Sequence, residues 1–347
     1  MNILAIRIEL LKLALYTTER AGPWRDRPLE QIPSEKILKA AEEGKYGVIA
    51  AIVYDLEQIL GLVRAALARS SLIVYFFSWA IKYSDELLVR TATDAASRAS
   101  VPVSIHLHHA QDEAVIKLAA DMLPFDSIMV DMSHYEKEEN LRKTAEWVAY
   151  CHERGIATEA EPGRIEGGED GVTDTEGPQA SKTTPEEVDE LIATGVDALA
   201  PAFGNIQPPT LNVYLGSLDA ESVKLSVLAK ISIPLINLKD RATNNRTPIT
   251  RRDLIRKQIN GRVRWVLHGT NRFSPNIMKQ CIAAPRKINV NRLVLDDYYV
   301  HMRAEFSQKV PRTKLIGQGT EHVISLTKTW MDICGYSGKS ADDQIGV

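Results

Sequence analysis

Histidine and carboxylate residues stand at the ends of several apolar segments of this chain. In chain order they are His106, His108, His109, Glu159, Glu161 and His268. Imidazole nitrogen and carboxylate oxygen are ligands that zinc takes in a tetrahedral shell, and catalytic sites keep one position open. An open position can polarise a substrate carbonyl or stabilise an enediolate. For His106 or His134 alone, a hydrogen-bonded structural role is the better interpretation, whereas His109, Glu161 and His268 together favour a metal site.

The elements that would position these groups repeat along the chain. Eight short apolar segments alternate with longer amphipathic ones, and they cover residues 47–53, 72–77, 102–107, 127–132, 156–161, 196–203, 264–269 and 287–291. Buried parallel strands have such continuous apolar runs. The helical segments between them include residues 55–69, 84–99, 140–155 and 184–195. Repeated strand–helix units predict a closed barrel or a doubly wound sheet. In a barrel the carboxyl ends of all strands meet at one rim.

Two segments break this alternation. Residues 163–184 are glycine-rich, acidic and polar, and they predict a long mobile loop after the fifth strand. Residues 236–262 are polar and basic, and their pattern assigns them to no element.

Size and charge limit the class of protein. A chain of 347 residues, 44% hydrophobic, is long enough for one large core. The net charge of -3 gives no electrostatic reason to expect nucleic acid or an anionic membrane as a partner. Three cysteines, far apart and in no CxxC spacing, fit a reducing compartment, so we expect a cytoplasmic location. Residues 1–20 are interpreted as an amphipathic helix rather than a signal peptide, and no apolar run is long enough to span a membrane.

Six segments resemble, in order, those of one enzyme family. They are VPVSIHLHHA (101–110), SIMVDMSHYEKEEN (127–140), ATEAEPGRIEGGEDG (157–171), TGVDALAPAFGNIQ (194–207), VLHGTNRFS (266–274) and KINVNR (287–292). On these segments the chain resembles the class II, zinc-dependent fructose-bisphosphate aldolases. The resemblance implies the α/β class and a (β/α)8 TIM barrel, in agreement with the strand count. It predicts a single domain over residues 1–347, with an N-terminal helical segment (1–35), a mobile active-site loop (163–184) and a C-terminal helical extension (300–347).

The resemblance also implies where a zinc ion would bind. The four ligand positions of the family fall on His109, Glu161, Gln207 and His268. Gln207 stands where the family has a histidine, and an amide oxygen is a weaker zinc ligand than imidazole. We therefore expect lower zinc affinity or a different divalent metal. Water or His108 could complete the ligand shell.

The family's proton-transfer groups are carried over in part. Its catalytic Asp falls on His108, an imidazole that can also exchange a proton near neutral pH. Its loop Glu falls on Glu169, in a glycine-containing segment that suits a lid. Without the resemblance, Glu169 would be interpreted as an exposed carboxylate on a disordered loop.

The family's phosphate cradle is the part that differs most. Residues 269–272 read Gly-Thr-Asn-Arg where the family has GGSG, and residues 291–292 read Asn-Arg where it has Asp-Thr. Arginine binds carboxylate or phosphate bidentately, so an anionic substrate would be held in a different geometry. The alternative is that both arginines face solvent or pair with the acidic loop. The expected substrate-binding residues are Ser78, Arg272, Asn289 and Arg292.

Two functions remain open on this sequence. The first is a metal-dependent aldolase-type lyase acting on a small carbonyl substrate through a metal-stabilised enolate, and inefficient on fructose 1,6-bisphosphate. The second is a catalytically inactive aldolase-fold protein with a structural or regulatory role. The resemblance implies a homodimer in either case.

Overall fold

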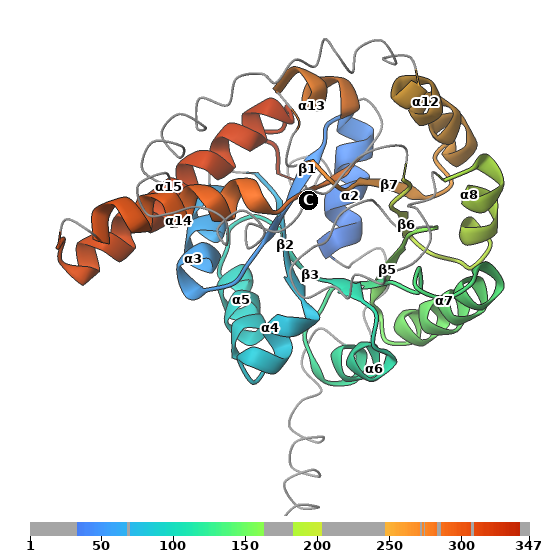
Figure 1. Cartoon of the computed structure of the whole chain (residues 1–347), viewed down its shortest axis with the longest axis horizontal. Coiled ribbons are helices and arrows are strands. Elements are labelled where there is room, and N and C mark those ends of the chain that lie inside the picture. The colour runs from blue at the N-terminus through green and yellow to red at the C-terminus, as the bar shows by residue number, and fades with distance from the viewer. Residues whose placement is uncertain are drawn as a thin grey trace, which may run out of the picture.

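The computed structural model describes residues 33–67, 70–162, 183–202, 247–270, 273, 275–282, 286–306 and 309–340. Eight parallel strands form a closed barrel in which each strand pairs with the next and β8 closes onto β1 (Figure 1). The strands are β1 (Val48–Ile52), β2 (Leu72–Phe77), β3 (Val103–Ala110), β4 (Ser127–Val130), β5 (Ala157–Ala160), β6 (Ala198–Leu199), β7 (Arg264–Leu267) and β8 (Lys287–Val290). The predicted (β/α)8 barrel is confirmed, and the doubly wound sheet is excluded.

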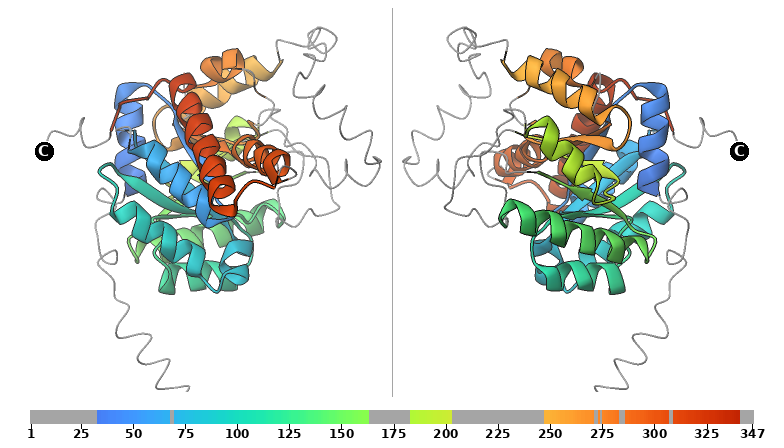
Figure 2. Two further views of the ribbon diagram at one scale, coloured as in Figure 1. Left: turned by 90° about the vertical axis from the view of Figure 1, so that its left-hand side faces the viewer. Right: turned by 90° about the vertical axis from the view of Figure 1, so that its right-hand side faces the viewer.

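Helices surround this barrel. They are α2 (Pro33–Gly44), α3 (Leu56–Ala66), α4 (Ser78–Tyr83), α5 (Leu87–Ser97), α6 (Glu113–Met122), α7 (Lys137–His152), α8 (Pro185–Ile192), α12 (Thr247–Ile259), α13 (Pro275–Cys281), α14 (Arg292–Phe306) and α15 (Arg312–Ile333). The C-terminal helix α15 packs on α3 and on α14, and the side views show it in red across the blue α3 (Figure 2). No helix in the described ranges is both long enough and apolar enough to cross a membrane.

Side-chain caps fix where several of these helices begin. The Asp55 carboxylate accepts a hydrogen bond from the backbone N–H of Gln58 at 2.8 Å, and Asp55 is the N-cap of α3. Thr184 and Glu187 form a reciprocal capping box at the start of α8. Such caps satisfy N–H groups that a helix leaves without partners in its first turn. The β1–α3 connection is therefore short, because the cap residue Asp55 comes three residues after the end of β1.

The sixth strand is shorter in the structure than the sequence predicts. The prediction covered residues 196–203, but the strand is limited to Ala198–Leu199. The backbone N–H of Ala200 still donates a hydrogen bond to the Ala160 carbonyl on β5 at 2.9 Å. Pro201 follows and has no N–H to donate, which accounts for the early end of the strand. The unassigned region 236–262 contains helix α12, while its first residues lie outside the described part of the chain.

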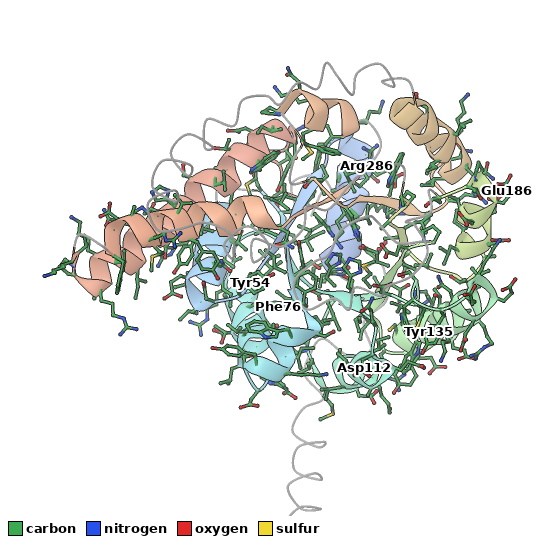
Figure 3. All side chains as sticks on the ribbon, viewed as in Figure 1. Tyr54, Phe76, Asp112, Tyr135, Glu186 and Arg286 are labelled. Atoms are coloured by element: carbon green, nitrogen blue, oxygen red, sulfur yellow. The ribbon has the colours of Figure 1, made fainter. Side chains whose placement is uncertain are left out.

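Strand alternation sorts the side chains into two layers. On β2, Ile73 and Tyr75 face the barrel interior, whereas Phe76 lies on the side of the helices. Side chains fill the space between strands and helices, and Glu186 marks the outer edge on α8 (Figure 3). The apolar core is therefore mainly the layer between strands and helices. This arrangement leaves the barrel interior available for polar groups.

Two predicted segments fall largely outside the described residues. Of the N-terminal segment 1–35, only residues 33–35 are described, and they begin α2. Of the loop 163–184, only Thr183 and Thr184 are described.

Candidate metal centre

Polar side chains line the barrel interior, where branched apolar side chains usually fill such a core. They stand at alternate positions of strands β3, β4, β5, β7 and β8 or directly after them, and all are buried. They are His106, His108, Ser127, Asp131, Glu159, Glu161, His268, Lys287 and Asn289. Burying such groups is costly unless they pair or bind an ion. Their concentration in one place therefore marks a functional site.

A local irregularity in β3 places two consecutive imidazoles in this interior. Successive strand side chains ordinarily point to opposite faces of a sheet. The pairing of β3 with β4 shifts register between Leu107 and Ala110, and His109 has a φ of 44°. This turn brings the rings of His108 and His109 together, with centroids 4.2 Å apart. A positive φ in a non-glycine residue costs about 1 kcal/mol or more, and such strain is typical of functional sites.

Asp131 orients the ring of His109. Its Oδ2 lies 2.7 Å from His109 Nδ1, and its Oδ1 accepts a 2.6 Å hydrogen bond from the Ser133 hydroxyl. Burial alone would raise the pKa of Asp131, but hydrogen bonding and charge from His109, with hydrogen bonds from Ser133, outweigh it and hold that pKa below its ordinary value. Since the carboxylate accepts at Nδ1–H, the Nε2 lone pair of His109 is the one available to an ion.

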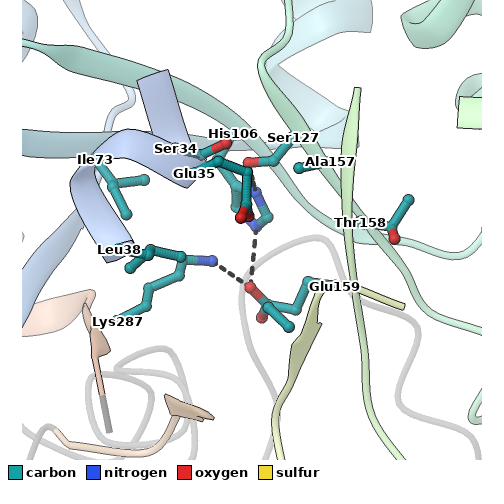
Figure 4. Close-up of a pocket in the computed structure, with 11 residues that line it drawn as sticks. Ser34, Glu35, Leu38, Ile73, His106, Ser127, Ala157, Thr158, Glu159 and Lys287 are labelled. Carbon is teal, nitrogen blue, oxygen red and sulfur yellow. Dashed lines mark hydrogen bonds and ion pairs between the residues drawn. The ribbon is translucent and has the colours of Figure 1, made fainter. Parts of the chain in front are cut away.

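Glu159 orients His268 in the same way but through the other ring nitrogen. His268 Nε2 lies 2.9 Å from Glu159 Oε1, and Lys287 Nζ lies 2.6 Å from Glu159 Oε2. Lys287 and His106 both point at Glu159, beside a small cavity under α2 (Figure 4). Burial lowers the pKa of His268 to about 4, so the ring is neutral and donates Nε2–H to the carboxylate. Its Nδ1 lone pair then faces the remaining carboxylate, Glu161.

Glu161 is the buried carboxylate that a bound cation would stabilise most. Its Oε2 is buried and has no hydrogen-bond partner among the described residues. Burial, reinforced by the charge of Asp131, raises the pKa of Glu161 to about 8. His268 Nδ1 lies 3.8 Å from Glu161 Oε2. A buried carboxylate so placed ionises readily when a divalent ion binds beside it, since an opposite charge favours the charged form.

Candidate ligand atoms form three overlapping groups in the barrel interior. Within each of three groups the atoms lie within 4.8 Å of one another, and the groups are His108, His109 and His268; His106, His108 and Glu159; and His109, Asp131 and Glu161. His109 belongs to the first and third groups, and the Glu161–His268 contact joins them. Buried imidazole and carboxylate donors match the ligand chemistry of zinc. The residues therefore fit a divalent metal.

Known proteins are similar to this chain over nearly its whole length. The sequence profile described as "Fructose-bisphosphate aldolase class-II" matches residues 32–235 and 240–339. A Coccidioides immitis protein assigned as a fructose-bisphosphate aldolase is 43% identical over 313 residues, which are 88% of this chain and 93% of that protein. This chain belongs to the class II fructose-bisphosphate aldolase family. The family resemblance inferred from the six segments is thereby confirmed, and membership makes the chain an aldolase-type lyase.

Solved structures agree with the class II aldolase fold. A crystal structure of a Coccidioides immitis protein assigned as a fructose-1,6-bisphosphate aldolase has a TM-score of 0.74 at 43% identity, covering 89% of this chain and 98% of that chain. The YdjI aldolase from Escherichia coli has a TM-score of 0.67, covering 87% of this chain and 96% of that chain. At 23% identity the second structure supports the fold alone.

The structure describes some of the predicted class II aldolase site residues and not others. Asn289 is buried, with its Nδ2 3.2 Å from His108 Nε2. Ser78 begins α4 directly after β2, and its buried Oγ has no hydrogen-bond partner among the described residues. Arg292 begins α14, and its side chain lies outside the description. Gln207, Glu169 and Arg272 lie outside the described residues.

Sequence reasoning missed the residues that contact the proposed metal ligands of this aldolase-family chain. Asp131 and Ser133 lie in the segment SIMVDMSHYEKEEN, which supported the resemblance without suggesting a role for either side chain. Glu159 stands at the end of a predicted strand and Lys287 begins the segment KINVNR, but neither pattern pairs the two side chains. For Glu159 the signal was present, because residues two apart on a strand face the same side. Glu159 and Glu161 therefore had to share the interior.

Proposed function

We propose that this chain catalyses metal-dependent cleavage or formation of a carbon–carbon bond next to a carbonyl group. His109, Glu161 and His268 would hold the divalent ion, with zinc as the first candidate. The observation that carries the proposal is that His109 shares one group of candidate ligand atoms with His268 and another with Glu161. Glu161 Oε2 is buried, without a hydrogen-bond partner among the described residues, and 3.8 Å from His268 Nδ1. When bound, such an ion supplies Lewis-acid stabilisation of developing negative charge on a substrate oxygen.

The chain's own residues prepare this site before substrate arrives. Asp131 and Glu159 fix the two imidazole rings in opposite tautomers, so that His109 presents Nε2 and His268 presents Nδ1. Prepositioned ligands avoid reorganisation during the reaction. Glu169 would move the proton, as the family resemblance implies. The assignment of His108 to the second acid/base role stays a prediction.

The substrate we propose is a small, anionic carbonyl compound other than fructose 1,6-bisphosphate. Thr270 stands where the family has the second glycine of its GGSG phosphate cradle, and its hydroxyl donates to the Asn289 carbonyl at 2.5 Å. The side chain thus ties the segment after β7 to β8, where glycine would let backbone amides approach a phosphate. Ser78, Asn289, Arg272 and Arg292 remain the proposed substrate-binding residues. The proposed homodimer rests on family resemblance alone, and the proposed cytoplasmic location rests on the cysteine pattern.

Metal analysis of the purified chain tests the first part of this proposal. We expect about one divalent ion per chain, lost in both His109→Ala and His268→Ala. Loss of the ion with an unchanged circular dichroism spectrum would show that the variants fold. A parent protein that binds no divalent ion after zinc loading would contradict the proposal and favour the structural or regulatory role.

A cleavage assay on the zinc-loaded enzyme tests the second part. Fructose 1,6-bisphosphate should be turned over far below about 10 per second, the median for enzymes. A panel of ketose monophosphates and anionic keto acids, assayed in the same way, should contain a better substrate. Turnover of the bisphosphate at ordinary enzymatic rates would contradict the substrate proposal and leave the metal site intact.

A further inference from the structure

We infer that His108 is a third imidazole ligand of the divalent ion, rather than an acid or base that acts on substrate. The inference rests on the proposed metal site, and it changes the expected ligand set to His108, His109 and His268 with Glu161. It assigns a different role to the residue that replaces the family's catalytic Asp.

The positions of the rings carry the inference. One ring nitrogen of each of His108, His109 and His268 lies within 4.8 Å of the others. The His108 ring centroid is 4.2 Å from that of His109 and 4.8 Å from that of His268. Zinc–nitrogen bonds of about 2.0–2.1 Å require nitrogens a few ångströms apart, so small ring rotations would close this triad on one ion.

The surroundings of His108 argue against proton exchange with a substrate. The residue has 0% exposure. Its ring packs edge-on against Tyr75 with centroids 4.7 Å apart, and Phe77 lies 5.5 Å away on a second side. A general base must come within hydrogen-bond reach of the proton it takes. A ring enclosed by two aromatic side chains and two other imidazoles has little surface for a substrate.

Asn289 determines which His108 nitrogen is directed to the ion. Its amide lies 3.2 Å from Nε2, so we assign Nδ1 as the coordinating atom. A half turn of the Asn289 amide would place Oδ1, which has no hydrogen-bond partner among the described residues, against Nε2–H. That orientation keeps the Nδ1 lone pair for the ion. His108 would then resemble His268, whose Nε2 contacts Glu159 and whose Nδ1 faces the site.

The histidine count makes the assignment testable without a variant. The chain has eight histidines, and all lie in the described part. Besides His109 and His268, the imidazole rings nearest the proposed metal site are those of His108 and His106. The His106 ring is 5.8 Å from that of His108, and its Nδ1 lies 2.7 Å from the Ser127 hydroxyl. A third imidazole on the ion would therefore come from His108, with His106 as the matched control.

The experiment combines zinc affinity with a count of bound imidazoles. X-ray absorption of the zinc-loaded parent should show three imidazoles, and His108→Asn should show two. Chelator competition should show that His108→Asn binds zinc about 100-fold more weakly than the parent. Residues that only support a ligand typically contribute about 10- to 100-fold, and loss of a ligand should cost at least the upper value. His106→Asn should still show three imidazoles. Its zinc affinity should fall by at most about 10-fold, the lower end for residues that support a ligand, because His106 reaches the site only through Glu159. Loading with Co2+ should give a visible spectrum that His108→Asn changes and His106→Asn does not.

Each outcome decides a separate point. Two imidazoles in the parent, or unchanged affinity and cobalt spectrum in His108→Asn, would overturn the inference while the metal proposal survives. If His108→Asn fails to fold, the imidazole count of the parent decides alone. A parent that binds no zinc would refute the proposed function itself.

Discussion

Glu159 contacts both His268 and Lys287 within the barrel, through its two carboxylate oxygens at 2.9 and 2.6 Å. Burial alone would raise the pKa of Glu159, but the charge of Lys287 and the hydrogen bond from His268 outweigh it and hold the pKa below its ordinary value. The carboxylate therefore stays charged in a buried setting. It can orient a metal ligand and neutralise a buried ammonium at the same time.

Removing the charge of Glu159 should weaken metal binding without removing a ligand. Glu159→Gln should lower zinc affinity about 10- to 100-fold, because partners that orient ligating histidines typically contribute that much. Chelator competition measures the effect. Unchanged affinity would show that Glu159 does not orient His268 for an ion.

Glu159 and Lys287 should also be energetically coupled. Breaking a buried ion pair from one side costs about 3–5 kcal/mol, because it leaves an uncompensated charge. Glu159→Gln and Lys287→Met should each reduce the free energy of unfolding by that order, and the double variant should lose clearly less than the sum. Urea unfolding of the four apo proteins measures the cycle. Additive losses would contradict the pairing.

Stability should depend on pH through Glu35 on α2. Burial raises the pKa of Glu35 to about 7, against the opposing charge of Arg264. Above about pH 4.3, the ordinary value for Glu, the unfolded chain loses this proton while the folded chain keeps it up to pH 7. Glu35 therefore reduces stability as pH rises between these values.

The variant Glu35→Gln isolates that effect. Relative to the parent, Glu35→Gln should be similarly stable near pH 4 and gain up to about 4 kcal/mol near pH 8, at 1.36 kcal/mol per pKa unit. Unfolding by urea across this range gives the difference between the two proteins. A difference that does not change with pH would contradict the raised pKa.

Two glycines of α15 should respond oppositely to alanine. A Cβ at Gly319 would lie 2.7 Å from a Tyr298 ring carbon, whereas a Cβ at Gly317 meets nothing within 4 Å. Gly319→Ala should destabilise the chain by about 1–3 kcal/mol through overpacking of α14 on α15. Gly317→Ala should stabilise it by about 0.5–1 kcal/mol, because alanine is the better helix former. Thermal unfolding of both variants checks the signs, and equal effects would argue against this helix packing.

Hydrophobic periodicity was enough to predict the eight strands, because buried parallel strands have nearly continuous apolar sequences. It left a closed barrel and a doubly wound sheet both open, and the family resemblance favoured the barrel. The same periodicity placed the end of the sixth strand too late, since it took no account of Pro201. At the site, motifs located His109, Glu161 and His268. No local pattern predicted the left-handed backbone of His109, which depends on a register shift against β4. The partners Asp131 and Lys287 come from other strands, so only the closed barrel brings them to the ligands.

The most direct measurement is a crystal structure of the zinc-loaded chain with anomalous data at the zinc edge. The account predicts one strong peak inside the barrel rim, about 2.0–2.2 Å from His109 Nε2, Glu161 and His268 Nδ1. An ion bound elsewhere, or a well-ordered barrel without one at saturating zinc, would contradict it.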